Sequence, residues 1–140
     1  MVYVDTSVVV ALLTLEPKTR AVTDWFAELK DTPVCADWLL AEFSSAIAIK
    51  LRVGQFSEAN ARRAHMEFAA LLEGGARLTP VSRSAFRAAS ELAEQYRYGL
   101  RAGDALHLAV ALELGASDMA TLDTTLAANA KRKGLRLVDF

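Results

Sequence analysis

Short apolar runs recur along the chain and alternate with longer segments of helical periodicity. We expect five β-strands, at residues 2–5, 33–36, 77–81, 118–122 and 135–138. A sequence in which strands alternate with helices is typical of a parallel sheet, because parallel neighbours need a long crossover connection. The pattern therefore predicts the α/β class with a mainly parallel central sheet.

Apolar periodicity, glycines and hydroxyl residues mark the expected helices. The first interval carries Val22, Trp25, Phe26 and Leu29 at the spacing of an amphipathic helix, with Pro17 in the first turn. Further helices are predicted directly after Asp5, at residues 38–53, after the N-caps Ser57 and Ser82, at residues 103–114, and from Asp123 to Gly134.

Two of these helices differ in how much of their surface is apolar. The helix after Ser82 is amphipathic, and we expect its inner face to carry Phe86, Ala89, Ala93 and Tyr96. The helix at 103–114 is apolar nearly all round, which predicts a central, buried element.

Four acidic residues stand in surroundings that normally exclude charge. Asp5 ends the first strand and Asp123 follows the fourth, while Glu42 and Asp104 interrupt apolar helical stretches. If strands 2–5 and 118–122 are neighbours, the two aspartates meet at the carboxyl edge of the sheet, where ligands collect in open parallel sheets. A divalent cation would offset the cost of desolvating such acids. The pattern therefore predicts metal-assisted chemistry.

Each acid also has a simpler interpretation. A helix follows Asp5 and Asp123 directly, so both suit the N-cap role, and the helix dipole favours Asp104 in a first turn. Glu42 would then extend its carboxylate to solvent from the rim of the protein. On this interpretation the chain is a non-catalytic α/β binding module.

Hydroxyl and imidazole side chains near the acids leave the same choice open. Thr6, Ser7 and Thr121 flank the aspartates and can orient them, or can serve as turn and cap residues. His107 and His65 lie on apolar helical faces, and we interpret both as hydrogen-bonded core residues without a catalytic role.

Composition narrows the class of protein. The 140 residues, 53% of them hydrophobic and 24% charged, predict one globular domain over residues 1–140. A net charge of −1 means that nucleic acid would have to be held by a local basic patch. Cys35 is the only cysteine, which excludes an internal disulfide, and no apolar run approaches the ~18 residues of a membrane span. We expect a cytoplasmic protein.

Four segments, in order, resemble the PIN domain, and in particular the VapC-type toxin ribonucleases of bacterial toxin–antitoxin pairs. They are Val4-Asp5-Thr6-Ser7, Leu40-Ala41-Glu42-Phe43, the stretch from Arg101 to Ala109 with sequence RAGDALHLA, and Thr121-Leu122-Asp123. The resemblance covers essentially the whole chain, and the fourth acidic position, which varies in the family, is an aspartate here.

The resemblance implies a three-layer α/β/α sandwich and an endoribonuclease that depends on Mg²⁺ or Mn²⁺. It implies that the catalytic, metal-binding acids are Asp5, Glu42, Asp104 and Asp123, supported by Thr6, Ser7 and Thr121. It also implies an RNA substrate, a cognate antitoxin and commonly a homodimer.

Basic residues must bring RNA to an acidic site. Arg101 is nearest in sequence to Asp104, and we expect it to contact a phosphate group; other candidates are Arg62, Arg63, Arg83, Arg87, Arg97, residues 131–133 and Arg136. A PIN-like nuclease of RNA processing, without an antitoxin, is the alternative within the family.

Overall fold

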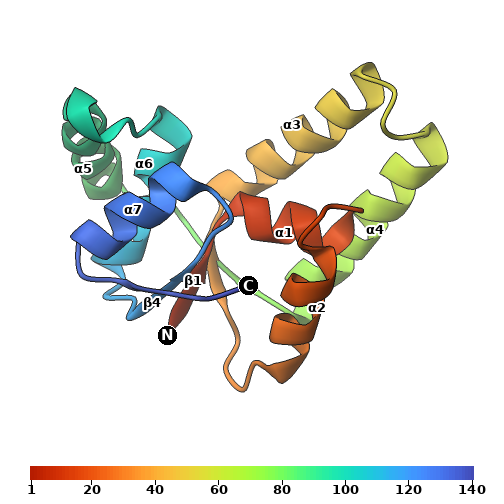
Figure 1. The fold of residues 1–140 in the computed structure, drawn as a ribbon, viewed down its shortest axis with the longest axis horizontal. Helices are drawn as coiled ribbons and strands as arrows, with labels where there is room; N and C mark the ends of the chain where they lie inside the picture. Colours follow the sequence, from red (N-terminus) through yellow and green to blue (C-terminus); the bar gives the residue numbers. More distant parts are fainter.

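The sheet has five short strands, all parallel, in the order β3–β2–β1–β4–β5 (Figure 1). The computed structural model describes residues 1–140. Its strands are β1 (Val2–Val4), β2 (Val34–Ala36), β3 (Arg77–Thr79), β4 (Asp118–Ala120) and β5 (Arg136–Leu137). Each lies inside a predicted range, so the five strands and the parallel sheet are confirmed.

Seven α-helices and one short 3₁₀ helix fill the connections. They are α1 (Thr6–Leu13), α2 (Thr19–Glu28), α3 (Trp38–Arg52), α4 (Glu58–Gly74), α5 (Arg83–Glu94), η1 (Tyr96–Tyr98), α6 (Ala102–Glu113) and α7 (Thr124–Arg132). Ser57 and Ser82 cap α4 and α5 as predicted, accepting hydrogen bonds from the backbone N–H groups of Asn60 and Ala85.

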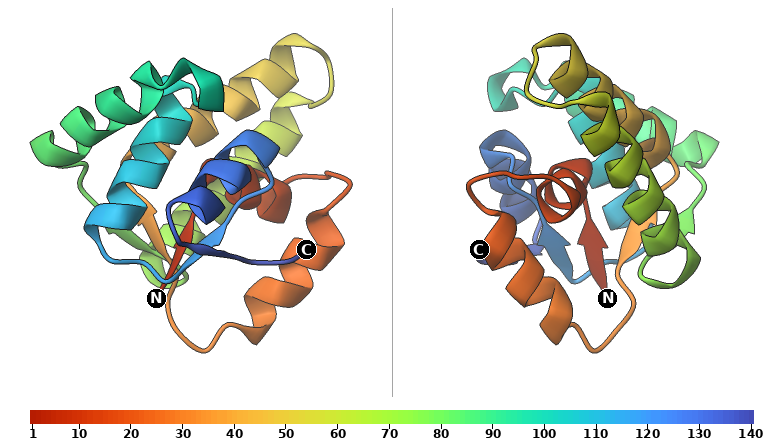
Figure 2. Two further views of the ribbon diagram at one scale, coloured as in Figure 1. Left: turned by 60° about the vertical axis from the view of Figure 1, so that its left-hand side comes forward. Right: turned by 90° about the vertical axis from the view of Figure 1, so that its right-hand side faces the viewer.

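The helices cover both faces of the sheet, which confirms the three-layer α/β/α architecture (Figure 2). Val2 and Val4 pack with α1–α4 on one face, and Tyr3 packs with α5–α7 on the other, as the alternation of side chains along a strand requires. The chain runs from β1 outward to β3 and then crosses back to β4. Because parallel crossovers are right-handed, this reversal moves the later helices to the opposite face.

On the first face, α3 and α4 form a helical hairpin that extends away from the sheet (Figure 1, upper right). The rings of Phe43 and Phe68 stack between the two helices, with their centroids 4.0 Å apart. Gly54 follows the end of α3 with a φ of 75°, a conformation that glycine adopts without strain. The predicted stop after residue 53 is therefore confirmed.

Two predictions about helix faces and ends are wrong. α2 begins at Thr19, so Pro17 precedes the helix and does not occupy its first turn. The buried face of α5 carries Ala85, Ala89 and Leu92, whereas Phe86 is exposed. The predicted inner residue Tyr96 lies beyond α5 and is also exposed. The small side chains of α5 let it pack closely on α6, which leaves no room for an aromatic ring between them.

The central position of α6 is as predicted. Seven consecutive residues, from Ala105 to Ala111, are buried between α5, α7 and the sheet. None of the helices combines the length and the apolar character needed to cross a membrane.

Candidate active site

The two central strands bring the first and the last of the predicted acids to one edge. β1 and β4 pair in register, with Val4 opposite Ala120, so the strands expected to be neighbours are neighbours. Asp5 follows β1 directly, and Asp123 begins the helix after β4. The connections turn in opposite directions from these two strands, and parallel sheets bind ligands at such a switch point.

Asp5 is held rigidly at this edge. Its carboxylate is buried and accepts hydrogen bonds from the hydroxyls of Ser7 at 2.6 Å and Thr121 at 2.8 Å. It also caps α1, accepting from the backbone N–H of Val8 at 3.3 Å. Burial raises the pKa of Asp5, while these hydrogen bonds oppose the rise. Thr121 in turn accepts from the backbone N–H of Asp123.

Glu42 is fixed by a separate network. Its Oε2 accepts hydrogen bonds from the hydroxyl of Thr6 and from Nε2 of His107, the latter at 2.7 Å. Burial by itself raises the pKa of Glu42, but the hydrogen bonds from His107 and Thr6 outweigh it and lower the pKa. Glu42 is therefore held in the ionised form.

Tyr3 forms a hydrogen bond with His107. The Tyr3 hydroxyl accepts a hydrogen bond from the backbone N–H of Ala36 at 3.2 Å and lies 2.8 Å from Nδ1 of His107. Burial raises the pKa of Tyr3, so its hydroxyl stays protonated and shares a hydrogen bond with Nδ1. Because an ionised carboxylate can only accept, Nε2 of His107 carries a proton and donates it to the hydrogen bond with Glu42. A buried chain of hydrogen bonds thus runs from the sheet to the carboxylate of Glu42.

Asp104 and Asp123 complete the acidic group in different ways. Asp123 caps α7, with Oδ1 accepting from the backbone N–H of Leu126 at 2.6 Å. Asp104 is half-buried in the first turn of α6. Burial raises the pKa of Asp104, and the charges of Asp123, Asp5 and Glu42 raise it further. No hydrogen bond from the protein offsets this repulsion.

The four acids line one cleft. A cavity of about 300 Å³ is bordered by Asp5, Glu42, Asp104 and Asp123, and an adjoining cavity of about 560 Å³ shares the last three of them. Arg101 also borders the larger cavity, which has no apolar residue in its lining. No three His, Cys, Asp or Glu side chains are placed to hold a metal ion directly. The cleft is thus an open acidic surface and not an all-protein cage.

Glycine is required where α6 meets α3. A Cβ atom on Gly103 would overlap Oε1 of Glu42 and would lie 3.3 Å from Nε1 of Trp38. The indole N–H of Trp38 is buried there without a hydrogen-bond acceptor. The absence of a side chain at residue 103 therefore lets Glu42 reach its position in the cleft.

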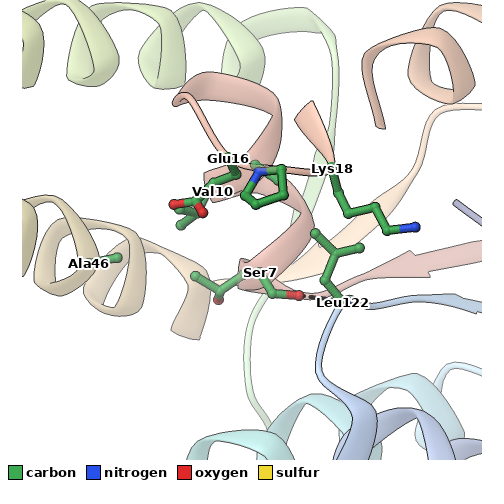
Figure 3. A pocket seen from close by; sticks show the side chains of 9 residues that line it. Ser7, Val10, Glu16, Lys18, Ala46 and Leu122 are labelled. Atoms are coloured by element: carbon green, nitrogen blue, oxygen red, sulfur yellow. Dashed lines mark hydrogen bonds between the residues drawn. The ribbon is translucent and has the colours of Figure 1, made fainter. Parts of the chain in front are cut away.

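A second, mostly apolar pocket of about 450 Å³ adjoins the acidic cleft. It shares Thr6, Ser7 and Ala46 with the cleft, and Val10, Glu16, Lys18 and Leu122 are among its other lining residues (Figure 3). These come from α1, the loop after it, α3 and the segment after β4. No local sequence pattern marks this pocket, because its walls come from four separate segments.

Comparison with known proteins identifies the fold family. Residues 2–136 match the PIN domain. The chain belongs to the PIN domain family. Comparison with curated proteins gives no match. This family match agrees with the resemblance seen in the sequence. The match covers nearly the whole chain.

Several solved structures are similar to this PIN domain. The toxin VapC20 of Mycobacterium tuberculosis, described as cleaving the sarcin–ricin loop, has a TM-score of 0.76 at 20% identity, covering 92% of this chain and 95% of that chain. FitAcB of Neisseria gonorrhoeae has a TM-score of 0.72 at 19% identity, covering 99% and 97%. VapBC2 of Rickettsia felis, bound to promoter DNA, has a TM-score of 0.65 at 19% identity, covering 99% and 98%. At these identities the likeness establishes the fold.

Proposed function

We propose that this PIN domain is a metal-dependent endoribonuclease and the toxin of a toxin–antitoxin pair. The observation that carries the proposal is the convergence of Asp5, Glu42, Asp104 and Asp123, from four distant segments, on one cleft bordered by Arg101. Such an arrangement suits phosphodiester hydrolysis, in which acids hold a metal ion and a nearby cation binds phosphate.

Helix capping alone does not account for the cleft. It explains Asp5 and Asp123, which do cap α1 and α7. Glu42 caps no helix, yet it is fixed at the same cleft by His107. Asp104 caps no helix either and lies half-buried in the same cleft, where burial and then the charges of Asp123, Asp5 and Glu42 raise its pKa. A protein that only binds through another surface has no need of this arrangement, so we favour the enzyme over the binding module.

The donor set fits Mg²⁺ or Mn²⁺. Both ions prefer oxygen ligands, and Mg²⁺ retains several waters and uses few carboxylates, which suits an open cleft better than a cage. The ion would bind among Asp5, Glu42, Asp104 and Asp123, in part through its own waters, because no three of these side chains are placed to hold it directly. When bound, it lowers the pKa of water and stabilises charge on a phosphate group under attack. Ser7, Thr121, Thr6 and His107 keep the carboxylates in place, and Arg101 binds the phosphate group.

The toxin assignment rests on the structural neighbours. Two structural neighbours, FitAcB and VapBC2, share this fold across nearly their whole length. Another neighbour, from Klebsiella pneumoniae, is described as a toxin–antitoxin complex. We therefore propose that a cognate antitoxin binds this chain and inhibits it, that the free protein forms a homodimer, and that it acts on RNA in the cytoplasm.

A cleavage assay tests the enzymatic part. Purified protein, free of antitoxin, is incubated with total cellular RNA and Mg²⁺, Mn²⁺ or a chelator, beside Asp104→Asn. The matched control is Asp24→Asn, an exposed acid on α2. We expect cleavage with metal by wild type and by the control, and none with chelator or by Asp104→Asn. Cleavage that survives both the chelator and Asp104→Asn would contradict the proposed site.

Growth and binding assays test the toxin part. Expression of the wild-type chain should arrest growth, and co-expression of the product of the neighbouring gene should restore growth and co-purify with it. A protein that cleaves RNA in vitro but has no such inhibitor would instead be a PIN-like nuclease of RNA processing. Size-exclusion chromatography with light scattering measures the homodimer.

A further inference from the structure

Two large aromatic side chains lie exposed beside the acidic cleft. Tyr96 and Tyr98 of η1 are 80% and 44% exposed, whereas Tyr3 and Phe43 are fully buried. η1 follows α5 and leads through Gly99 to Arg101, and both of these residues border the cavity that Asp104 and Asp123 share. The segment that carries the exposed rings therefore continues directly into the lining of the candidate active site.

Each ring is paired with a guanidinium group. The guanidinium carbon of Arg132 lies 3.6 Å from the centroid of the Tyr98 ring, and that of Arg97 lies 5.8 Å from the centroid of Tyr96. Arg132 is exposed, so its guanidinium group remains accessible to a ligand. Tyrosine rings and arginine guanidinium groups are both flat surfaces on which another flat group can stack.

A buried asparagine fixes this arrangement. Asn129 of α7 is 3% exposed, and its amide donates to the backbone carbonyl of Tyr98 at 2.9 Å. Its side-chain oxygen accepts from Arg132 at 2.9 Å. One side chain thus anchors η1 to α7 and holds Arg132 over the tyrosine, so the surface is formed before any ligand arrives. We call Tyr96, Arg97, Tyr98 and Arg132 the stacking platform.

We propose that the stacking platform binds unpaired nucleotides next to the phosphate that is cleaved, which rests on the proposed ribonuclease function. Nucleobases in single-stranded RNA stack on aromatic rings and on arginine planes, while arginines pair with phosphates. The acidic cleft itself repels a polyanion, so the substrate must be held by cations at its edge. The net charge of the chain is −1, so the whole protein does not attract RNA. The local cations are Arg97, Arg101 and Arg132.

An RNA ligand fits this surface better than a protein ligand. The rings are not part of a continuous apolar patch, since arginines cover or flank them and Lys131 and Lys133 adjoin Arg132 in sequence. A protein interface would bury an apolar centre, whereas a base needs only a flat face with a cation nearby.

Binding to a labelled, unstructured oligoribonucleotide tests the platform. Fluorescence anisotropy is measured with chelator present, so that no cleavage occurs. We expect Tyr96→Ala to weaken binding by about fivefold or more, and Tyr96→Phe to bind nearly as wild type, because stacking needs the ring and not the hydroxyl. Arg132→Gln should also weaken binding and reduce the slope of log affinity against log salt by about 0.7.

Two exposed residues away from the cleft serve as controls. Phe86→Ala removes an aromatic ring that is 51% exposed on α5, and Arg20→Gln removes a cation that is 95% exposed on α2. Both should bind RNA as wild type does. Circular dichroism checks that every variant is folded, and Tyr96 is exposed enough for its loss to leave the core intact.

The possible failures are distinguishable. If wild type cleaves RNA but Tyr96→Ala and Arg132→Gln bind with wild-type affinity, the platform is wrong and the ribonuclease stands. If wild type neither binds nor cleaves RNA, the proposed function fails and the platform with it. If the two variants keep RNA affinity but lose the antitoxin, the surface docks protein and the proposal is overturned.

Discussion

Replacement of Gly103 by alanine tests the geometry of the cleft with a single methyl group. The new Cβ would overlap Oε1 of Glu42 and approach Nε1 of Trp38 to 3.3 Å. Trp38 and Glu42 are both on α3, and the indole is buried in part, so the carboxylate is the group that can move. We therefore expect Gly103→Ala to displace Glu42 from its place between Thr6 and His107.

The size of the effect follows from the bonds that break. Glu42 loses its hydrogen bond to His107, 2.7 Å long, and its bond to Thr6. Hydrogen bonds to charged groups contribute about 1.5–3 kcal/mol each, and alanine in a helix regains up to about 1 kcal/mol. Because the two bonds together contribute about 3–6 kcal/mol, we expect a net loss of about 2–5 kcal/mol in the free energy of unfolding. A misplaced catalytic group costs about 100-fold in rate.

Gly74→Ala is the matched control. Gly74 ends α4, and a Cβ there meets no atom within 4 Å. Urea titration gives the free energy of unfolding, and RNA cleavage at saturating metal gives the rate. Gly74→Ala should cleave RNA at the wild-type rate and should be as stable as wild type or up to about 1 kcal/mol more stable. If Gly103→Ala behaves as Gly74→Ala does in both measurements, then Glu42 is not held against α6, and this description of the cleft is refuted.

Three other substitutions probe the hydrogen bonds and charges around the sheet. Tyr3→Phe leaves a buried backbone N–H and Nδ1 of His107 without a partner, so urea titration should show a loss of about 1–3 kcal/mol; an unchanged value would contradict the network. Asp104→Asn relieves repulsion in the cleft, so the metal-free variant should melt at the wild-type temperature or higher while cleavage is lost; a lower melting temperature would argue against repulsion. The hydrogen bonds from Arg136 lower the pKa of Asp118 from 3.8 to about 2, so this pair stabilises the fold above pH 3.8 and stops doing so as the pH falls toward 2. The difference in melting temperature between wild type and Arg136→Gln should therefore shrink over that range, and a constant difference would rule out the pair as its cause.

Much of the fold was predictable because its signals are local. Apolar runs of β-branched residues located all five strands, and serines and glycines located helix ends. The pairing of β1 with β4 was only conditional in the sequence, since strand order depends on contacts between distant segments. The acids were visible because each stands in an apolar setting, but nothing local shows that they share one cleft.

The residues that position Glu42 were beyond sequence analysis. His107 was correctly interpreted as a hydrogen-bonded core residue, but its partner is 65 residues away, and only the folded chain brings the two together. The same interpretation of His65 was wrong, because the side chain of His65 is exposed on α4. Gly103 gave no signal either, because a glycine near a helix start has many explanations. The inner face of α5 was predicted correctly at Ala89 and Ala93 but wrongly at Phe86 and Tyr96, because aromatic residues usually favour the interior.

Capping and metal binding were alternatives in the sequence, but the structure makes them compatible. Asp5 and Asp123 cap α1 and α7, and Asp104 lies in the first turn of α6, so three helix N-termini meet at the cleft. The positive end of each helix dipole favours a carboxylate, which offsets part of the repulsion among the acids. Since helices start where parallel strands end, the topology that creates the switch point also supplies these dipoles. The fold therefore stabilises the acidic cleft before any cation binds.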